Sequence, residues 1–305
     1  MKKTFLGKRK IKTGDVVFQT VNILFFLLFA LICIYPFYYI IINSISDNEL
    51  VKKGIIRFLP QGIHFQNYTK IFQLNGIGRA AVNSVLRTVL GTGAMLISST
   101  VLGYAMSRKE YWHRKFWYRF LVITMYFGAG LIPGYLNMKR LGLLNNFWVY
   151  VLPAFVSPYN MILVKTYIES IPESLEEAAI VDGGGYFARF TRVILPLCKP
   201  IIATVTIFTA VGQWNAFMDT ILYMTGSKNQ TLQSVLYMYL TQSNRMAELM
   251  KEGGMAALSE AERYAANPQS VRLTITVVTL LPVLMIYPFF QRYFTKGIMI
   301  GAVKG

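Results

Sequence analysis

Long apolar runs separated by short polar connections dominate the chain. No charged residue occurs from Val16 to Ser46, and five further apolar runs follow. A helix needs about 20 mostly apolar residues to cross a bilayer, and each run is long enough. The pattern predicts six transmembrane helices, at about Val16–Ser46, Val82–Ser107, Phe116–Met138, Phe147–Ile168, Leu197–Met218 and Leu273–Gln291.

The composition supports an all-α, polytopic membrane protein. Of the 305 residues, 54% are hydrophobic and only 15% are charged, whereas soluble chains carry about 25% charged residues. The two cysteines and two histidines have no disulfide-scaffold or metal-site spacing. The first apolar run is too long for a signal peptide and lacks a small-residue cleavage site. We therefore expect an uncleaved first span and no metal site.

The basic residues predict which side of the membrane each connection faces. Segments 1–15, 108–115, 165–199 and 292–304 carry 17 lysines and arginines, and the longer segments 43–80, 139–146 and 219–272 carry 12. Because these residues concentrate on the cytoplasmic side, we predict a cytoplasmic amino terminus in a bacterial plasma membrane. The net charge of +17 then reflects topology, and we expect no nucleic-acid binding.

The acidic residues argue against a carrier that works alone. All 14 lie outside the six predicted spans, whereas ion-coupled transporters keep a carboxylate within a helix. The sequence contains neither a phosphate-binding glycine loop nor an HExxH helix. We therefore predict that the chain is not an enzyme and that a partner supplies the energy for uphill transport.

A polar segment between the fourth and fifth spans has the features of two short helices. Ser170 and Glu173 form an S-x-x-E pattern, which predicts a capping box at the start of the first helix. The glycines at 183–185 predict its end. Arg189 and Arg192 follow on one side of a second, basic helix. The segment would present an acidic helix and then a basic one at the inner surface.

The residues of this segment resemble the EAA loop of ABC importer permeases. Glu177-Ala178-Ala179 is followed by Asp182-Gly183 and then by Leu195-Pro196, at the spacing of that family. The departure is Gly184, where alanine is commoner. The EAA triplet alone is weakly specific, but the full loop with six spans is strongly so.

Other segments are similar to the carbohydrate branch of that family, in particular to the second permease of maltose-type oligosaccharide importers. They are Asn83-Ser84, Tyr104-Ala105, Trp214-Asn215 and the tail from Tyr287 to Gly305. The resemblance covers nearly the whole chain and implies the type I ABC importer permease fold. It also implies a second permease, two copies of a cytoplasmic ATPase that bind ATP and Mg²⁺, and an extracytoplasmic sugar-binding protein.

In such permeases the loop is a helix that docks into a cleft of the ATPase. The resemblance therefore implies that Glu177 meets a basic group there, although a solvated helix face is the alternative. The residues to which it assigns ATPase coupling are Glu177, Ala178, Ala179, Asp182, Gly183, Arg189, Leu195 and Pro196.

Polar and aromatic residues in the spans predict a sugar path. Sugars favour aromatic faces together with hydrogen-bonding side chains. Trp214 has two equally good interpretations, as part of such a path or as an anchor at the membrane interface. A charge at Arg87 is costly unless paired or hydrated, so this residue either lines the path or pairs within the assembly. The predicted path residues are Asn83, Arg87, Tyr126, Gln213, Trp214 and Asn215.

Three other features have two interpretations each. The tail residues Lys296, Gly297, Gly301 and Lys304 either contact the ATPase, as the resemblance implies, or form a flexible basic end. The long outer loop 219–271 either meets the binding protein or is a passive cover. Glycines 128, 130 and 134 permit close helix approach, and Pro133 favours a kink.

These observations divide the chain into a cytoplasmic tail 1–15, a permease domain 16–291 and a second cytoplasmic tail 292–305. Within the domain we expect a transport core at about 78–290 and a coupling loop at 169–196. The predicted function is a permease subunit of an ATP-driven sugar or oligosaccharide importer. The alternatives are a facilitative channel or ion-coupled carrier without an ATPase, and a membrane-anchored enzyme, for which no paired carboxylates or nucleophile constellation is found.

Overall fold

The computed structural model describes residues 13–73, 76–241 and 269–302, with side chains described except at 13, 227, 271, 287 and 289–302. Throughout these residues the secondary structure is helical and no strand occurs. The chain divides into two compact units, Met1–Tyr68 with Asn267–Val277, and Thr69–Ala266 with Val278–Gly305.

The first unit is built on the apolar helix α1 (Thr13–Ser44), which coincides with the first predicted span. Most of its side chains are apolar and exposed, an arrangement that suits a helix surrounded by lipid. A short turn connects α1 to α2 (Asn48–Lys52). Ile42 of α1, Val51 of α2 and Ile56 of the following segment form a small buried core. Leu273, from the start of the last helix, packs on this core.

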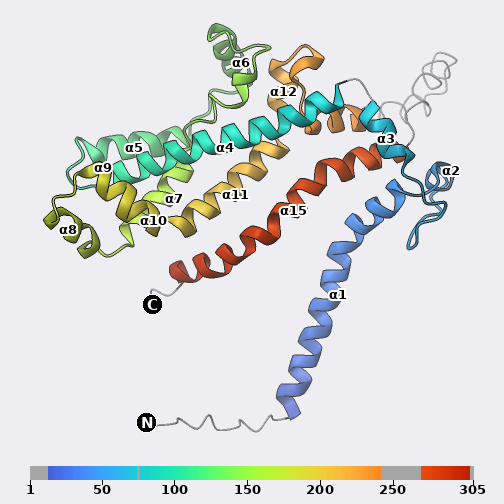
Figure 1. Cartoon of the computed structure of the whole chain (residues 1–305), viewed down its shortest axis with the longest axis horizontal. Helices are drawn as coiled ribbons and strands as arrows, with labels where there is room; N and C mark the ends of the chain where they lie inside the picture. Colours follow the sequence, from blue (N-terminus) through green and yellow to red (C-terminus); the bar gives the residue numbers. More distant parts are fainter. Residues whose placement is uncertain (1–12, 74–75, 242–268, 303–305) are drawn as a thin grey trace. The chain divides into compact units, whose positions relative to one another are not determined.

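The second unit is organised around α4 (Ile77–Ser107), another helix long and apolar enough to cross a membrane. α7 (Pro158–Glu169) and α11 (Lys199–Asn215) pack along it, as Figure 1 shows. Two glycines of α4 mark close approaches. A Cβ added at Gly91 would lie 2.7 Å from the Gln213 amide nitrogen, and one at Gly103 would lie 2.8 Å from a Val164 methyl carbon. A larger residue at Gly103 would push α4 and α7 apart, and one at Gly91 would displace the Gln213 side chain.

The third predicted span is not one continuous helix. It forms α5 (Arg114–Thr124) and α6 (Leu131–Arg140), separated by residues 125–130. Gly130 has a φ of +84°, which glycine adopts without strain, and a helix cannot continue through it. The predicted close approach of helices at these glycines is also not found, because a Cβ added at Gly128 or Gly130 would meet no atom within 4 Å.

The fourth predicted span is also interrupted. It contains the 3-10 helix η1 (Phe147–Tyr150), an irregular stretch and then α7, which is capped by Ser157. Most of the fifth predicted span is the single helix α11, and the bend lies at its start: α9 (Tyr186–Ala188), the π-helical η2 (Arg189–Ile194) and α10 (Leu195–Leu197) precede it and meet it at an angle of 76°. Pro200 lies in the first turn of α11, where a missing N–H breaks no helical bond.

The last helix, α15 (Gln269–Ala302), extends the sixth predicted span at both ends and contains Pro282 and Pro288. Shorter elements are α3 (Gln66–Gln73), α12 (Met218–Tyr223), η3 (Ser227–Asn229) and a helical segment at 232–241. The tail 1–12, most of the predicted outer loop (242–268) and residues 303–305 lie outside the described part of the chain.

The six-span prediction is only partly matched. Among the described residues, two helices, Gly14–Ser44 and Ile77–Ser107, are long and apolar enough to cross a membrane, or three if the bent pair Tyr186–Leu197 and Lys199–Asn215 is one span. The helical membrane class is therefore confirmed, whereas the number of six spans is not.

Candidate functional site

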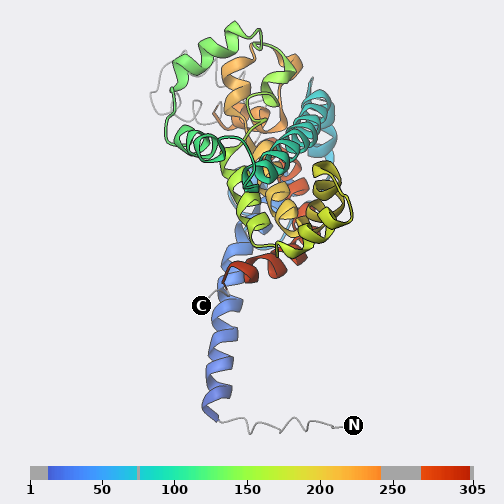
Figure 2. The same cartoon turned by 90° about the vertical axis from the view of Figure 1, so that its left-hand side faces the viewer.

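The predicted coupling segment, 169–196, lies beside the end of α4 in both Figure 1 and Figure 2. Its first helix, α8 (Ser174–Val181), does not start with the predicted capping box. The Ser170 hydroxyl instead donates to the Tyr167 carbonyl at 2.7 Å. Glu173 stands at the N-cap position without a capping bond and pairs with Lys109 at 3.0 Å. The Ser170 side chain thus bonds the end of α7, and α8 begins three residues later than the predicted capping box places it.

Two consecutive glycines end α8. Gly183 has a φ of +78°, and its N–H donates to the Ile180 carbonyl at 2.9 Å. The N–H of Gly184 donates to the Ala179 carbonyl at 2.8 Å, which completes a Schellman motif. A Cβ added at Gly184 would lie 2.7 Å from that carbonyl oxygen. The departure from alanine at this position therefore fits the tight turn of this chain.

The buried carboxylate of the segment belongs to Glu176, which is 5% exposed. It accepts a hydrogen bond from the Tyr104 hydroxyl at 3.0 Å and forms ion pairs with Arg108 and with Arg189, the latter at 3.5 Å. Tyr104 and Arg108 belong to α4 and its C-cap, and Arg189 opens η2. One anion thus connects two cations and a hydroxyl from two helices.

Glu177, by contrast, is exposed, and the described residues give it no ion-pair partner. Ala178 and Asp182 are also exposed, and so are two large apolar side chains of the same segment, Val181 at 87% and Phe187 at 81% exposure. A surface that combines acidic and large apolar residues is typical of a contact site for another protein.

The other residues of the predicted coupling set differ in exposure. The Arg189 side chain is 11% exposed, and its guanidinium lies 4.0 Å above the Tyr186 ring. Ala179 and Leu195 are half-buried, and Pro196 is exposed. Ile194, which directly precedes Leu195, packs into a buried core with Val164 and Ile168.

A cavity of about 670 Å³ lies within the second unit, where α4, α7 and α11 meet the chain around η1 and α12. Its lining includes aromatic rings and neutral hydrogen-bonding groups together with one Arg and one Asp. The polar and aromatic lining residues are Arg87, Tyr150, Tyr159, Asn160, Phe208, Thr209, Gln213, Asp219 and Tyr223.

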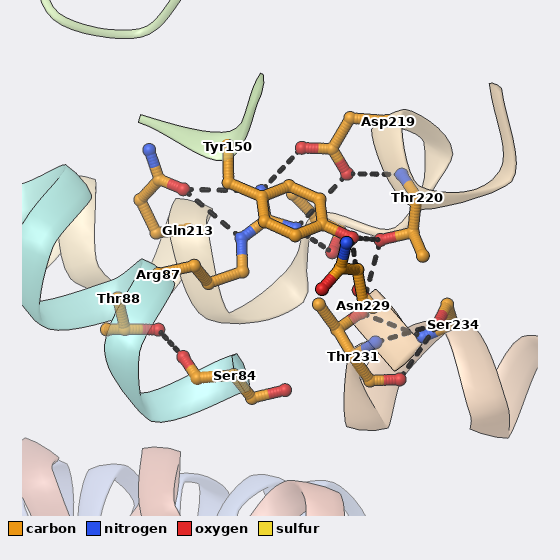
Figure 3. A network of polar contacts seen from close by, with 11 residues as sticks. Ser84, Arg87, Thr88, Tyr150, Gln213, Asp219, Thr220, Asn229, Thr231 and Ser234 are labelled. Carbon is orange, nitrogen blue, oxygen red and sulfur yellow. Dashed lines mark hydrogen bonds and ion pairs between the residues drawn. The ribbon is translucent and has the colours of Figure 1, made fainter. Parts of the chain in front are cut away.

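Arg87 is the central cation of this cavity and is 2% exposed. Its guanidinium forms a bidentate pair with the Asp219 carboxylate at 2.6 and 3.1 Å (Figure 3). It also donates to the Gln213 side-chain oxygen at 3.2 and 3.4 Å and to the Ala216 carbonyl at 3.1 Å. All five N–H groups are therefore used, and the buried charge is compensated within the chain.

Tyr150 connects this ion pair to α12 and to the chain that follows it, at Thr220 and Asn229. Its ring lies 4.4 Å from the Arg87 guanidinium carbon. Its hydroxyl donates to the Asn229 carbonyl at 2.6 Å and shares a second hydrogen bond of 3.1 Å with the Thr220 hydroxyl (Figure 3). The Ser84 hydroxyl accepts from the Leu232 N–H at 2.8 Å. These bonds hold the chain at residues 229–232 against η1 and α4.

The structure brings only two of the predicted path residues to the cavity, Arg87 and Gln213. Asn83 instead donates to the carbonyls of Lys228 and Gln230 at 3.1 and 2.9 Å. The indole of Trp214, which is 8% exposed, donates to the Thr279 carbonyl at 2.8 Å. Asn215 and Tyr126 are exposed and do not line this cavity.

Several residues of both sites are absent from the predicted sets. They are Glu176 and Tyr104 at the coupling segment, and Tyr150, Asn160 and Asp219 at the cavity. Of the predicted tail contacts, Lys304 lies outside the described residues. Lys296, Gly297 and Gly301 lie on α15, in a part of the helix for which the structure describes the backbone only. Within the described residues, no group of three or more His, Cys, Asp or Glu side chains could hold a metal.

Comparison with known proteins defines the class to which this fold and segment belong. A family model described as "Binding-protein-dependent transport system inner membrane component" matches residues 4–300. The chain therefore belongs to this family and is a permease component of a membrane transport system.

Individual relatives agree over nearly the full length. The chain is 36% identical over 283 residues to the polygalacturonan/rhamnogalacturonan transport system permease protein YtcP of Bacillus subtilis (strain 168), covering 92% of this chain and 96% of the relative. It is 35% identical over 291 residues to Protein LplC of the same strain, covering 95% of each.

A solved structure supports the same fold. A chain from the crystal structure of a bacterial ABC transporter involved in the import of the acidic polysaccharide alginate superposes with a TM-score of 0.78 at 30% identity. The superposition covers 93% of this chain and 98% of the other. The protein thus has the permease fold of ABC importers.

Proposed function

We propose that this permease imports an acidic oligosaccharide in an ATP-driven complex. It would form the translocation path with a second, similar permease, receive substrate from an extracytoplasmic binding protein and couple to two cytoplasmic ATPase subunits through segment 169–196. ATP and Mg²⁺ would be bound by those subunits and not by this chain. The proposal places the amino terminus in the cytoplasm, as the distribution of basic residues indicates.

The observation that carries the proposal is the two-sided construction of α8. Glu176 fixes the helix to the end of α4 and to η2, and the Schellman turn ends it. Glu177, Ala178, Val181 and Asp182 remain exposed. A helix that is fixed on one side and exposed on the other is suited to receive force from a docked protein. An acidic position at its centre is suited to a basic cleft.

The substrate class is supported by the relatives and by the cavity. One relative is named for polygalacturonan and rhamnogalacturonan, and the superposed transporter for alginate, which its description calls acidic. The cavity, of about 670 Å³, offers tyrosine rings and amide and hydroxyl groups. Such groups satisfy sugar rings and hydroxyls that have lost their water. Because Arg87 is already paired with Asp219, the cavity is close to neutral, which favours passage over tight binding.

The coupling role is tested with Glu177→Lys in the complete complex, reconstituted in lipid vesicles. The variant replaces attraction to the ATPase with repulsion at an exposed position and leaves the core unchanged. We expect normal assembly, with oligosaccharide uptake and binding-protein-stimulated ATP hydrolysis reduced at least tenfold. Normal uptake by this variant would reject the assignment.

The matched control is Glu110→Lys, which makes the same charge change at an exposed residue outside the segment and is expected to transport normally. The same vesicles test the substrate class when acidic and neutral oligosaccharides of equal length are compared. Uptake of the neutral series alone would reject the acidic class. Uptake that persists without the ATPase subunits would favour a facilitative channel.

A further inference from the structure

The two neighbouring glutamates of α8 differ in exposure and in the partners of their carboxylates. Glu177 is exposed, whereas Glu176 is 5% exposed and is surrounded by cationic and hydroxyl groups. The contacts of Glu176 all reach outside its own helix, to Tyr104 and Arg108 at the end of α4 and to Arg189 on η2. The family-level motif assigns a role to Glu177 and leaves Glu176 unexplained.

Other ionic contacts between this segment and the rest of the permease are weak by comparison. The pair between Lys109 and Glu173 is 77% and 68% exposed, and exposed pairs contribute little because water and salt screen them. Glu169 pairs with Lys165 within α7 and with Arg114, but it lies before α8 begins. Among the described residues, Glu176 makes the buried ionic contact that joins α8 to α4.

The surroundings of Glu176 also require its negative charge. Arg189 is 11% exposed, and its Nε atom is buried without a hydrogen-bond partner. Arg108 lies 4.9 Å from the Tyr104 ring and is 19% exposed. Without the carboxylate, two largely buried guanidinium groups would face each other with no anion between them, an arrangement that burial makes costly.

We propose that Glu176 is a positioning residue that fastens α8 to the end of α4, so that the coupling segment and α4 move as one body during transport. The proposal rests on the proposed function, because it concerns how a force on α8 reaches the membrane part of the chain. Glu177 would meet the ATPase, and Glu176 would transmit the displacement. The two adjacent carboxylates would therefore have separate tasks.

The proposal is tested first in the unaltered segment by a distance measurement. Spin labels are attached to Val101→Cys, exposed on α4, and to Ser174→Cys, exposed at the start of α8, in a background of Cys33→Ser and Cys198→Ala. The assembled complex is measured nucleotide-free and with trapped ATP. We expect one narrow distance distribution that is the same in both states. A distance that changes between the states would overturn the proposal.

Two isosteric variants then separate the neighbouring carboxylates. Glu176→Gln is expected to broaden the distance distribution and to lower stimulated ATP hydrolysis about tenfold, as the loss of hydrogen bonds to a charged group implies. Glu177→Gln is expected to retain the narrow distribution of the wild type. A Glu176→Gln complex with the wild-type distribution would overturn the proposal. If this variant fails to assemble, a wild-type distance that changes between the two states still overturns the proposal.

The outcomes also distinguish this proposal from the proposed function. If Glu177→Lys transports normally, the coupling assignment itself has failed. If Glu177→Lys abolishes uptake but the label distance changes between nucleotide states, the permease is coupled to its ATPase and only the fastening role of Glu176 is rejected.

Discussion

Two ionic networks are anchored on α4, one at Arg87 and one at Arg108, and they are built in opposite ways. At the cavity a cation is the centre, and Arg87 has Asp219 as its single carboxylate together with neutral oxygen acceptors. At the coupling segment an anion is the centre, and Glu176 has two arginines and one tyrosine. The first network is balanced in charge, and the second has one excess cation.

The difference indicates what each network is suited to do. A balanced, bidentate pair with every donor used has no capacity for a further ligand and serves to hold α12 on α4. A network with an excess cation tolerates the loss of one contact, because the remaining arginine still compensates Glu176. The cavity network is thus the more sensitive to a single substitution, and the coupling network is the more redundant.

The largest expected effect comes from Arg87→Ala. It leaves Asp219, which is 25% exposed, without a cation and removes a fully buried side chain, so the free energy of unfolding should fall by about 3–5 kcal/mol. Arg189→Ala should cost clearly less, because Arg108 remains on Glu176. Thermal unfolding of the purified complex measures both. Equal losses would break the contrast between the networks.

A smaller effect is expected for Gly183→Ala. This variant tests whether the turn at Gly183 and Gly184 brings Arg189 into ion-pair distance of Glu176. The positive φ of +78° at Gly183 costs a residue with a Cβ about 1–2 kcal/mol. Gly185 has a φ of −68° and open space around its Cα, so Gly185→Ala is the matched control and should be silent. Thermal stability and stimulated ATP hydrolysis should fall only for the first variant. If Gly183→Ala changed neither thermal stability nor stimulated ATP hydrolysis, the turn would not position the network around Glu176.

The smallest effect is expected for Lys109→Ala, at the exposed pair beside the buried network. Since Lys109 and Glu173 are 77% and 68% exposed, the loss should be below about 1 kcal/mol and should shrink further at high salt. A melting series at low and high ionic strength measures it. A loss as large as that of Arg87→Ala would contradict the use of burial to rank these contacts.

The helical membrane class followed from local patterns, since a charge-free run as long as that of α1 is typical of a membrane span. The breaks were harder to predict. Gly130 and Pro133 were visible in the sequence, but glycine permits both close packing and a positive φ, and only the surrounding structure shows that the second applies here.

The site residues show a different limit. Glu176 and Glu177 are identical in chemistry, and adjacent residues of a helix lie about 100° apart around its axis. Which of them is buried depends on which face of α8 packs against the end of α4, and a local pattern does not contain that information. The predicted capping box also placed the start of α8 incorrectly. The pairing of Arg87 with Asp219 joins residues 132 positions apart, and a single sequence contains no signal for such a contact.

The continuity of α4 has a mechanical consequence. Its helix runs without interruption from Ile77 to Ser107, so Arg87 and Arg108 are separated along the axis by roughly 32 Å, and nearly six turns bring them back to similar faces. A rod of that length acts as a lever: a tilt of about 10° at the coupling end displaces the other by roughly 5–6 Å, close to the rise of one helical turn. A displacement of that size at Arg87 exceeds the reach of its hydrogen bonds to Asp219, so α12, which carries Asp219, must either follow α4 or release it.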